Sequence, residues 1–573
     1  MTAAVVRAGW RRVSSLSPSL LPRSSLSLLL AATLAVASLP ASAQETMVEW
    51  TVADGDSLTS LSSNLLVTPQ SWREVARLNR LPNPAYVVPG QVLRIPLRLV
   101  KSTAIEARVV SVVGDVRAGG NPIAEGSPLP EGQALQTGAG SSAVVELGDG
   151  SRVQLPPSSL AEVVANRQYG AAPGAVPVGV GSASGPAASW FAGALRVLRG
   201  SVEIFATKVL RAKPLEVTTP TAVVGVRGTH YRVTVGEAAA QPTRSEVLEG
   251  LVRFERADRV FGADLAAGYG ATIDTAVPAP IVKQLPTAPD LSGVPARFER
   301  PLVRFELPGE TSPVRVQVAQ DSAFLRLVSD QRVPAGTDVR IAGLEDGNWF
   351  LRARRVDASE LEGFDATRPF VLKARPEPPA TLTPRASGKQ TAGSVQFAWA
   401  QNTEARNAQL QIAEDAAFTR LVLNSDSIAD ASMALPLTTP GTYYWRMASV
   451  RANGDHGPFG DPLSFELRPQ PEPPQGGLDK DGKGIVVRWS GRPQDRQRVQ
   501  FARDIGFTQL VAEEELTQPE WSFTRPAEHG AYFFRYRTVE PDGFVSDWSS
   551  PLTIEIPRDW NPLLLLVPLI LVL

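Results

Sequence analysis

A motif repeated three times in the second half of the chain constrains the fold more than any other sequence feature. Each copy has Gln-x-Ala at its centre, beginning at Gln317, Gln411 and Gln500, and a Phe seven residues after the Gln. An aromatic residue lies eleven or twelve residues before each Gln, and a Gly opens an aromatic strand thirty residues after it. Three matches at fixed offsets indicate three copies of one structural unit.

The repeated unit contains short alternating strands, which predicts a β-sandwich in each copy. We place the copies at 290–375, 380–468 and 474–557. Proline-rich linkers at 375–379 and 469–474 predict stiff, extended spacers between them. The third copy also resembles fibronectin type III-like modules, through the segment Gly-Phe-Val-Ser-Asp-Trp-Ser at 543–549.

The repeated aromatic and basic residues have more than one interpretation. The aromatic residues could form a sugar-stacking platform, but we favour packing in the sandwich core for Phe305, Trp399, Trp489 and the strands that begin at Gly347, Gly441 and Gly530. An Arg follows in every aromatic strand, at Arg352, Arg446 and Arg535. We expect these three side chains to be solvated or paired.

Alternating strands also fill the segment before the repeats. Residues 143–155 predict two strands around a Gly-Asp-Gly turn, and further strands are predicted at 200–204, 215–217 and 250–254. A loop at 169–189 is rich in Gly, Ala and Pro and predicts a solvated insertion.

This segment resembles the FecR domain over residues 104–275. The resemblance is carried by Gly138-x-Gly140, by the run Thr-Pro-Thr-Ala-Val-Val-Gly-Val-Arg-Gly-Thr at 219–229, by Glu249-Gly250-x-Val252 and by Ala267-Gly268. We expect Arg227 to pin loop carbonyls rather than to contact a ligand. Members of this family relay receptor occupancy to a sigma factor, a role that needs a cytoplasmic segment and a spanning helix. We find neither, so the resemblance implies binding of an unidentified envelope protein and no anti-sigma activity.

The first module is predicted to follow the order β-α-α-β within residues 46–98. Residues 50–58 predict a strand that runs into a turn and a helix start. A second helix is expected to open at Thr68-Pro69, with Thr as the N-cap and Pro at the first helical position, and to end near Asn79. Its residues Trp72, Val75 and Ala76 have the spacing of one buried face. Residues 87–96 predict a turn and a second strand.

This module resembles the LysM domain, through Gly55-Asp56-Ser57-Leu58, Asn79 and the run from Pro89 to Pro96. The resemblance implies binding of N-acetylglucosamine-containing glycans, chiefly peptidoglycan, in a shallow groove between two loops. Backbone, Asn and Ser groups suit the acetamido group, and an apolar floor suits the sugar ring. The prolines of the second loop could reshape that wall, and Asp54 or Asp56 could be a turn former. Carried over to this sequence, the groove residues are Gly55, Asp56, Ser57 and Leu58 on one side and Leu81, Pro82, Asn83 and Pro84 on the other.

Both ends of the chain carry apolar segments. Four Arg, an apolar run from Leu26 to Leu39 and a small-residue Ala-Ser-Ala site predict a cleaved secretory signal over 1–43, with an uncleaved anchor as the alternative. The tail at 560–573 includes the apolar run from Leu563 to Leu573, which as a helix would cover about 17 Å of a hydrocarbon core of about 30 Å. We therefore expect an exported protein of the periplasm or cell envelope, with membrane contact through this tail.

Motifs and composition disfavour catalysis and nucleic-acid binding. The chain has no Cys, three His in separate segments and a formal charge of −1 without a basic block. We find no nucleophile motif, phosphate loop or His pair at metal spacing, so we expect no catalytic residue, metal site or cofactor. The segment Asp479 to Gly482 lacks the ligands of a calcium loop and predicts a hairpin turn. A pair of acids that meet only in space is the alternative that would allow a glycosidase.

The sequence therefore predicts a multidomain, mainly β protein that is not an enzyme. We expect the LysM-like module to bind peptidoglycan, the FecR-like domain to bind a protein partner, and the repeats to act as spacer or docking surface. The alternative is an envelope signalling regulator of the FecR type without its own anti-sigma segment.

Overall fold

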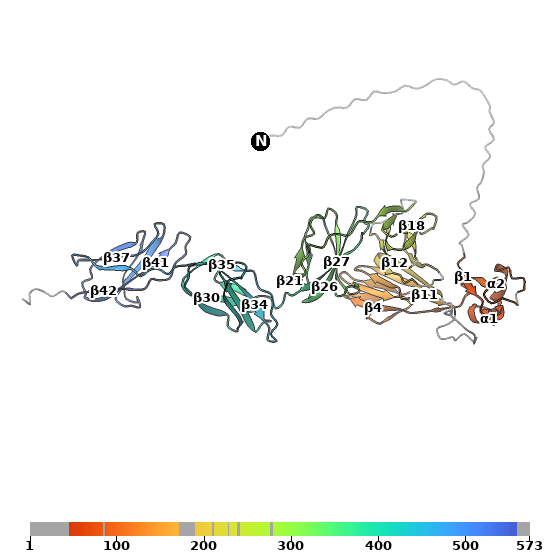
Figure 1. The fold of residues 1–573 in the computed structure, drawn as a ribbon, viewed down its shortest axis with the longest axis horizontal. Helices are drawn as coiled ribbons and strands as arrows, with labels where there is room; N and C mark the ends of the chain where they lie inside the picture. Colours follow the sequence, from red (N-terminus) through yellow and green to blue (C-terminus); the bar gives the residue numbers. More distant parts are fainter. Residues whose placement is uncertain are drawn as a thin grey trace, which may run out of the picture.

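The computed structural model describes residues 45–83, 86–170, 190–208, 211, 213–226, 228–237, 241–274 and 279–558. The predicted signal segment, Pro84, Arg227, the apolar tail and most of the low-complexity loop lie outside these residues. The modules follow one another along the long axis of the molecule, from the LysM-like module at one end to the third repeat at the other (Figure 1). The described chain is mainly β, as expected from the alternating pattern.

The LysM-like module has the predicted order of elements. These are β1 (Met47–Thr51), α1 (Leu58–Leu65), the 3-10 turn η1 (Pro69–Ser71), α2 (Trp72–Leu78) and β2 (Val92–Pro96), followed by η2 (Leu97–Leu99). Strands β1 and β2 pair antiparallel. Helix α2 ends at its C-cap Asn79, and Val75 and Ala76 are buried as predicted while Trp72 is half-buried.

The start of the second helix differs in detail from the prediction. Pro69 begins η1, and α2 starts only at Trp72. The Thr68 hydroxyl lies 2.7 Å from the Ser71 hydroxyl and makes no capping bond to a backbone N–H. A 3-10 turn therefore occupies the segment in which the first turn of the helix was predicted. Such turns are common at the ends of helices.

The FecR-like domain is built from strands that hydrogen-bond in a closed order around one apolar core. Its strands are β3 (Ser102–Ala104), β4 (Ala107–Val113), β5 (Val116–Ala118), β6 (Asn121–Pro122), β7 (Pro128–Leu129), β8 (Ala134–Thr137), β9 (Ser142–Glu146), β10 (Arg152–Leu155), β11 (Leu160–Tyr169), β12 (Trp190–Phe205), β13 (Leu215–Thr218), β14 (Ala222–Val226), β15 (His230–Val235), β16 (Thr243–Glu249), β17 (Leu251–Arg256), β18 (Gly262–Ala266), β19 (Tyr269–Ile273) and β20 (Ile281–Gln284). The predicted hairpin is β9–β10, and β20, which pairs with β19, lies past residue 275.

Strand β12 joins the two halves of this domain. Its first half pairs with β11 and β13, and its second half pairs with β10 and β15. The change falls at Gly200, which has φ +75°, and a Cβ there would lie 2.7 Å from the Cα of Ser159. Only glycine combines this conformation with such a close approach, so Gly200 allows one strand to serve both sheets.

Each repeat folds as two facing sheets. The first repeat contains β21 (Arg297–Phe298), β22 (Val303–Phe305), β23 (Val314–Ala319), β24 (Leu327–Val333), β25 (Val339–Ile341), β26 (Gly347–Arg355) and β27 (Ala366–Leu372). The second contains β28 (Ala380–Thr383), β29 (Gly388–Thr391), β30 (Gly393–Ala400), β31 (Asn407–Ala413), β32 (Leu421–Ile428), β33 (Ser432–Leu437), β34 (Gly441–Val450) and β35 (Leu463–Arg468). The third contains β36 (Gln475–Leu478), β37 (Gly484–Arg488), β38 (Arg496–Ala502), β39 (Leu510–Leu516), β40 (Glu520–Thr524), β41 (Gly530–Val539) and β42 (Leu552–Ile556).

The repeated residues occupy equivalent places in the three sandwiches. The Gln of each copy lies opposite its Arg on the neighbouring strand, as Gln317 and Arg352 do. The aromatic residues before each Gln are buried, with Trp399 2% and Trp489 8% exposed. Core packing, rather than a sugar-stacking platform, is therefore confirmed for these residues.

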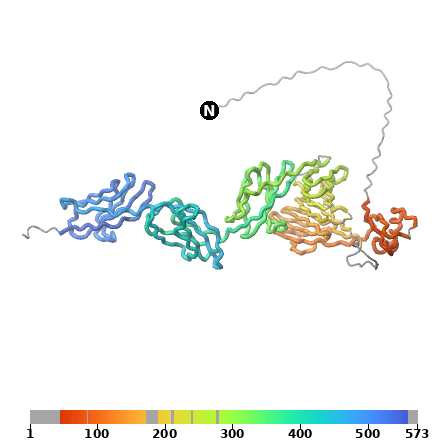
Figure 2. The backbone as a smooth tube through the Cα atoms, in the orientation of Figure 1, coloured from red at the N-terminus to blue at the C-terminus, as the bar shows by residue number. Residues whose placement is uncertain are grey.

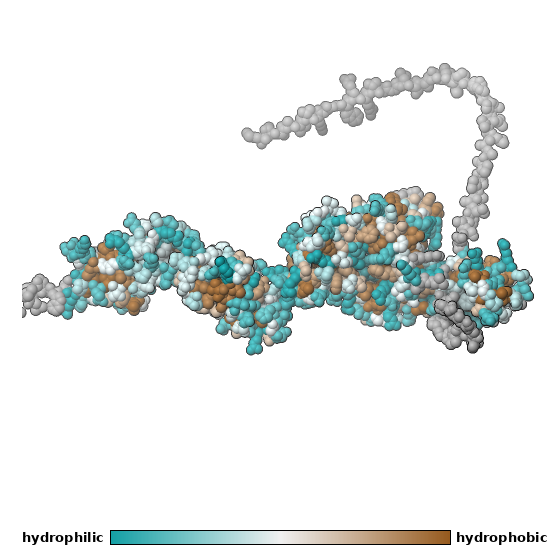
Figure 3. All heavy atoms as spheres, viewed as in Figure 1, coloured by the Kyte–Doolittle hydropathy of each residue, from teal (hydrophilic) through white to brown (hydrophobic). Residues whose placement is uncertain are grey.

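The repeats are connected by single passages of the chain, which Figure 2 traces. The segment Asp479 to Gly482 forms the predicted hairpin turn between β36 and β37, in which the Asp479 carboxylate accepts a hydrogen bond from the N–H of Lys483 at 2.9 Å. On the face in Figure 3, apolar areas interrupt the hydrophilic surface of the second and third repeats. Among the described residues, no helix is long and apolar enough to cross a membrane.

Candidate functional site

The first predicted wall of the glycan groove is a turn fixed by its own hydrogen bonds. Gly55 has φ +86° and no atom within 4 Å of a Cβ, so its backbone is open to an approaching ligand. The Asp56 carboxylate accepts a hydrogen bond from the N–H of Ala53 at 2.9 Å, which makes Asp56 a turn former. Ser57 caps α1 through a reciprocal pair of hydrogen bonds with Ser60, at 3.1 Å and 2.9 Å.

The second predicted wall follows helix α2. Leu81 is half-buried and Pro82 and Asn83 are exposed, while Pro84 lies outside the described residues. The carbonyl of Asn83 accepts a hydrogen bond from the N–H of Tyr86 at 3.1 Å. This wall therefore presents an amide side chain and an apolar ring from a tight turn.

Asn79 connects the end of α2 to the second strand. Its amide nitrogen donates to the carbonyls of Val75 and Arg94, each at 2.8 Å, and its amide oxygen accepts from the N–H of Arg94 at 2.7 Å. These three hydrogen bonds from one side chain join the carbonyl of Val75 in α2 to the backbone of Arg94 in β2. Asn79 thus holds the second loop in place and belongs to the structure of the module.

The two predicted walls meet over the core of the module. Leu58, which is 3% exposed, belongs to the apolar cluster against which Leu81 packs. The side chain of Leu58 therefore points inward, so only its backbone is left for a ligand. The residues of the two loops that are exposed or half-buried include Gly55, Asp56 and Ser57 on one side and Pro82 and Asn83 on the other.

One exposed aromatic residue of this region is absent from the predicted site. Tyr86 is 71% exposed and follows the second loop directly. Aromatic rings offer a flat apolar surface with a polar hydroxyl at the edge, which suits a sugar ring. The sequence did contain a signal for Tyr86, namely an aromatic residue that follows two prolines and an Asn in a segment without a core pattern.

The LysM-like module is fixed to the FecR-like domain through an aromatic contact. Trp190 at the start of β12 is 4% exposed and belongs to the core cluster of the LysM-like module. Its ring lies 6.0 Å from that of Trp50 in β1, and Tyr169 packs against the same cluster. The two loops of the predicted groove are therefore carried on a base that includes part of the second domain.

A second polar constellation lies where the FecR-like domain contacts the first repeat. The carboxylate of Glu203 in β12 accepts hydrogen bonds from Arg352 of β26, at 3.0 Å, and from His230, at 2.8 Å. Arg232 donates to the carbonyl of Gly363 at 3.0 Å and to Asp365 at 3.2 Å. These charges are buried from both sides, so the sandwich and the FecR-like domain form one packed unit there. The expectation that Arg352 would be solvated or paired is met by pairing.

The two carboxyl groups of this contact have opposite electrostatic environments. Burial favours the neutral acid of Glu203, but Arg352, the hydrogen bond from His230 and Arg354 together hold the pKa of Glu203 well below its usual value. Burial and the neighbouring charge of Glu362 raise the pKa of Glu246 to about 7. The second carboxyl oxygen of Glu246 is buried without a hydrogen-bond partner, so its surroundings favour the neutral acid over the charged carboxylate.

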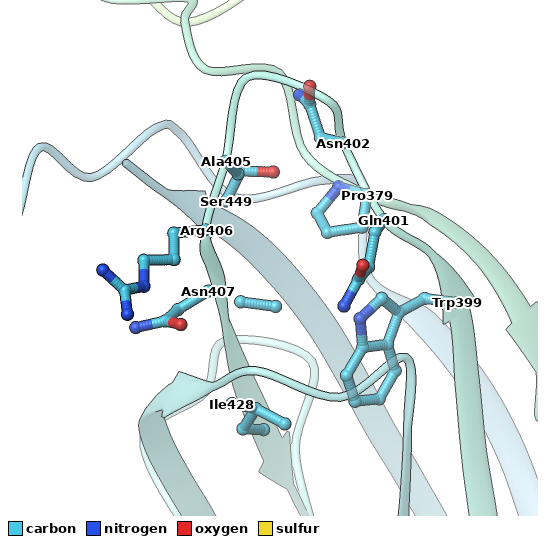
Figure 4. A pocket seen from close by; sticks show the side chains of 10 residues that line it. Pro379, Trp399, Gln401, Asn402, Ala405, Arg406, Asn407, Ile428 and Ser449 are labelled. Atoms are coloured by element: carbon cyan, nitrogen blue, oxygen red, sulfur yellow. The ribbon is translucent and has the colours of Figure 1, made fainter. Parts of the chain in front are cut away.

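Two hollows of the described chain are too small for a sugar. One of about 10 Å³ lies in this charge cluster, between Gln154 and Glu362. Another of about 10 Å³ lies in the second repeat beside Trp399, Gln401 and Ser449 (Figure 4). Each has room for about one water molecule, so neither could hold a glycan.

Comparisons with known proteins agree with two of the modules. The LysM domain model matches residues 51–96, and the FecR protein model matches residues 133–253. Both kinds of domain are non-catalytic. No curated protein matches the chain significantly.

Three solved structures are similar to parts of the chain. A putative anti-sigma factor from Parabacteroides distasonis is 16% identical, with 26% of this chain and 59% of that chain covered and a TM-score of 0.19. The fibronectin(III)-like modules of Clostridium thermocellum CbhA are 14% identical, with 31% and 93% covered and a TM-score of 0.20. The FN1–FN3 domains of chicken CNTN1 are 10% identical, with 43% and 90% covered and a TM-score of 0.19. This chain therefore spans about 59% of the length of the anti-sigma protein that it matches.

Proposed function

We propose that this protein is a non-enzymatic protein of the cell envelope that binds peptidoglycan through its LysM domain and a protein partner through its FecR-like domain. In this proposal the chain is exported and its tail contacts a membrane. The observation that carries the proposal is the match of the LysM family to residues 51–96, where the two loops present backbone, amide and apolar groups on an open surface.

The chemistry of these loops suits an N-acetyl sugar. The exposed backbone of Gly55 can approach the acetamido group closely, and Asn83 and Ser57 lie on the two loops as polar side chains. The rings of Pro82 and Tyr86 supply apolar surface for the sugar ring and the methyl group. A single shallow site of this kind binds weakly, so a second contact elsewhere in the envelope would strengthen attachment.

The test is sedimentation of the secreted chain with purified peptidoglycan, with soluble chitin oligomers as the competitor. We expect the chain to pellet and the oligomers to release it. The substitution Asn83→Trp places a large ring in the proposed groove and should abolish pelleting. The control Val67→Ser changes a residue that is 57% exposed at the opposite end of α1, and it should bind as the unchanged chain does.

Failure of the unchanged chain to pellet at low salt would remove the glycan assignment. If Asn83→Trp and Val67→Ser lost pelleting equally, the loss would not depend on the position of the groove, and this would contradict the assignment of the groove. The secreted chain is preferred to an isolated LysM fragment, because Trp190 of the FecR-like domain completes the core of that module.

A second candidate function is envelope signalling, favoured by the match of the FecR family to residues 133–253. In that case the FecR-like domain reports the state of an envelope receptor. Cell fractionation separates the two: wall-associated protein supports the first proposal, and inner-membrane protein with a regulatory phenotype on deletion supports the second. A pull-down with the secreted chain would identify the protein partner.

A further inference from the structure

The first repeat shows how one face of this sandwich binds another domain. We call this the arginine face, defined in the first repeat by Gln317, Arg352 and the turn residue Phe324. Arg352 donates to Gln317 at 2.8 Å and lies 4.6 Å from the centre of the Phe324 ring. Its remaining donors bind Glu203 of the FecR-like domain, at 3.0 Å and 3.4 Å.

The contact uses hydrogen bonds to the backbone as well. The side chain of Gln154 donates to the carbonyl of Phe324 at 2.6 Å, and the hydroxyl of Ser142 donates to the carbonyl of Leu327 at 2.8 Å. At the arginine face the docked domain therefore presents the Glu203 carboxylate from β12, flanked by neutral donors from β9 and β10. A charged group held between neutral hydrogen bonds gives such a contact its orientation.

The third repeat contains the same network. Arg535 donates to Gln500 at 2.8 Å and lies 3.9 Å from the centre of the Phe507 ring. Gln500 donates to Glu513 at 3.0 Å, as Gln317 donates to Asp330 at 2.8 Å. The arginine face of the third repeat, defined by Gln500, Arg535 and Phe507, is thus built on the same frame as that of the first.

The carboxylate that completes this face in the first repeat has no counterpart in the third. Among the described residues, no carboxylate forms an ion pair with Arg535 or with its neighbour Arg537. The ring of Trp548 lies 4.4 Å from the Arg535 guanidinium and 4.5 Å from that of Arg537. Burial, followed by the charge of Arg537, lowers the pKa of Arg535, and Nε of Arg537 is buried without a hydrogen-bond partner.

Equivalent apolar positions differ in exposure in the same way. Leu327 pairs with Ala319 and is 1% exposed in the first repeat, whereas Leu510 pairs with Ala502 and is 44% exposed in the third. The first leucine lies in the contact with the FecR-like domain, and the second has no covering domain among the described residues. No second domain among the described residues covers this face of the third repeat, where Leu510 is exposed and Arg535 and Arg537 are half-buried.

The second repeat lacks part of this arrangement. Arg446 stacks on Phe418 at 4.0 Å and donates to Gln411 at 2.9 Å, but Ala448 stands where Arg354 and Arg537 stand in the other copies. The single guanidinium at this face of the second repeat also lies 4.3 Å from the centre of the Phe459 ring. The second repeat consequently provides a matched internal control for the third.

We propose that the arginine face of the third repeat docks a protein that presents a Glu or Asp side chain from a β-strand, as β12 presents Glu203 to the first repeat. The two guanidiniums, each beside the ring of Trp548, bind the carboxylate, and the rim around Leu510 packs on the partner. This surface is separate from the glycan loops, so its test does not depend on glycan binding.

The test uses the full chain and a fluorescent peptide with the sequence of residues 199–207, which carries Glu203 at its centre. Binding is followed by fluorescence polarisation at low salt. We expect one saturable site, and about tenfold weaker binding for Arg537→Gln and for a peptide with Glu203→Gln, since each removes one side of a charge-assisted contact. Arg446→Gln in the second repeat should leave the affinity unchanged.

Arg537 is the preferred substitution because its side chain forms no hydrogen bond with the described residues of this repeat. Thermal unfolding checks that the variant remains folded. The variant Arg537→Lys, which keeps the charge but loses the planar fork, should bind with intermediate affinity. The proposal is overturned if the peptide shows no saturable binding, if Arg537→Gln binds as tightly as the unchanged chain, or if Arg446→Gln weakens binding equally.

Discussion

The guanidinium of Arg352 lies 3.0 Å from the carboxylate of Glu203, although the two residues are 149 positions apart in the sequence. One residue belongs to the first sandwich and the other to the FecR-like domain. Through this contact the first repeat, which we expected to be a spacer or docking surface, packs with the FecR-like domain as one unit. The third repeat carries the equivalent Arg535, with which no carboxylate of the described residues forms an ion pair, so the two arginines have different surroundings.

Replacing Glu203 with Gln should destabilise the unit formed by the FecR-like domain and the first repeat by about 3 kcal/mol. The reason is that Arg352, Arg354 and Arg232 would stay buried near a neutral amide. Calorimetry should show the corresponding transition at a lower temperature. The control Glu162→Gln removes a more exposed ion pair with Arg196 and should cost less than about 1 kcal/mol. Equal effects of the two substitutions would contradict a buried charge cluster.

Stability of the same unit should depend on pH through Glu246. Its folded pKa of about 7 lies above the ordinary value of 4.5, so the folded state binds the proton more tightly. This contribution is complete below the ordinary pKa and is lost as the pH rises through about 7. The unfolding temperature should therefore fall between pH 5 and pH 8, and Glu246→Gln should flatten that fall.

Glu249→Gln, at the exposed end of the same strand, serves as the control for this profile and should keep the fall. A Glu246→Gln chain with the original pH dependence would show that another group is responsible.

Replacing Trp190 with Ala should loosen the LysM module from the FecR-like domain. Removing a ring that is 4% exposed in the shared core should cost about 3 kcal/mol. Hydrogen exchange should become faster in β1 and α1, which contact that core. The substitution Leu198→Ala, at a position 37% exposed on the same strand, should leave exchange in these elements unchanged. Unchanged exchange after loss of Trp190 would mean that the module holds together without it.

Tyr86→Ala should weaken sedimentation with peptidoglycan by about tenfold, because it removes a ring on which a sugar can stack. Tyr86→Phe keeps the ring and should retain most of the binding. Since Tyr86 is 71% exposed, neither change should alter the unfolding temperature. Full binding by the Ala variant would exclude the ring from the site.

The order of modules followed from local patterns. The β-α-α-β order of the LysM module depends on helix starts, on the turn at Gly55 and on the side chain of Asn79, all within about fifty residues. The sandwiches followed from a repeat whose aromatic residues fill a core of their own copy. Such contacts are short in sequence, so the periodicity of the chain reports them directly.

The geometry of the proposed glycan site could be predicted from the sequence only in part. The pattern located both loops but could not reveal that Leu58 points inward or that Tyr86 points outward, because both are apolar residues next to turns. Side-chain direction at the end of a helix depends on where the core lies. That position is decided by elements such as β2 and by Trp190 from another domain.

The kinds of module, their order and the equivalence of Arg352, Arg446 and Arg535 could be inferred from local patterns and from the repeat. The sequence could not show that Arg352 is buried against Glu203 while Arg535 forms no ion pair with the described residues, because these environments depend on contacts between domains. Taken alone, each of the three repeats has the same Gln and Arg pair on one face. The environment of each face depends on the neighbouring domain, whose contact residues lie far away in the chain and follow no period.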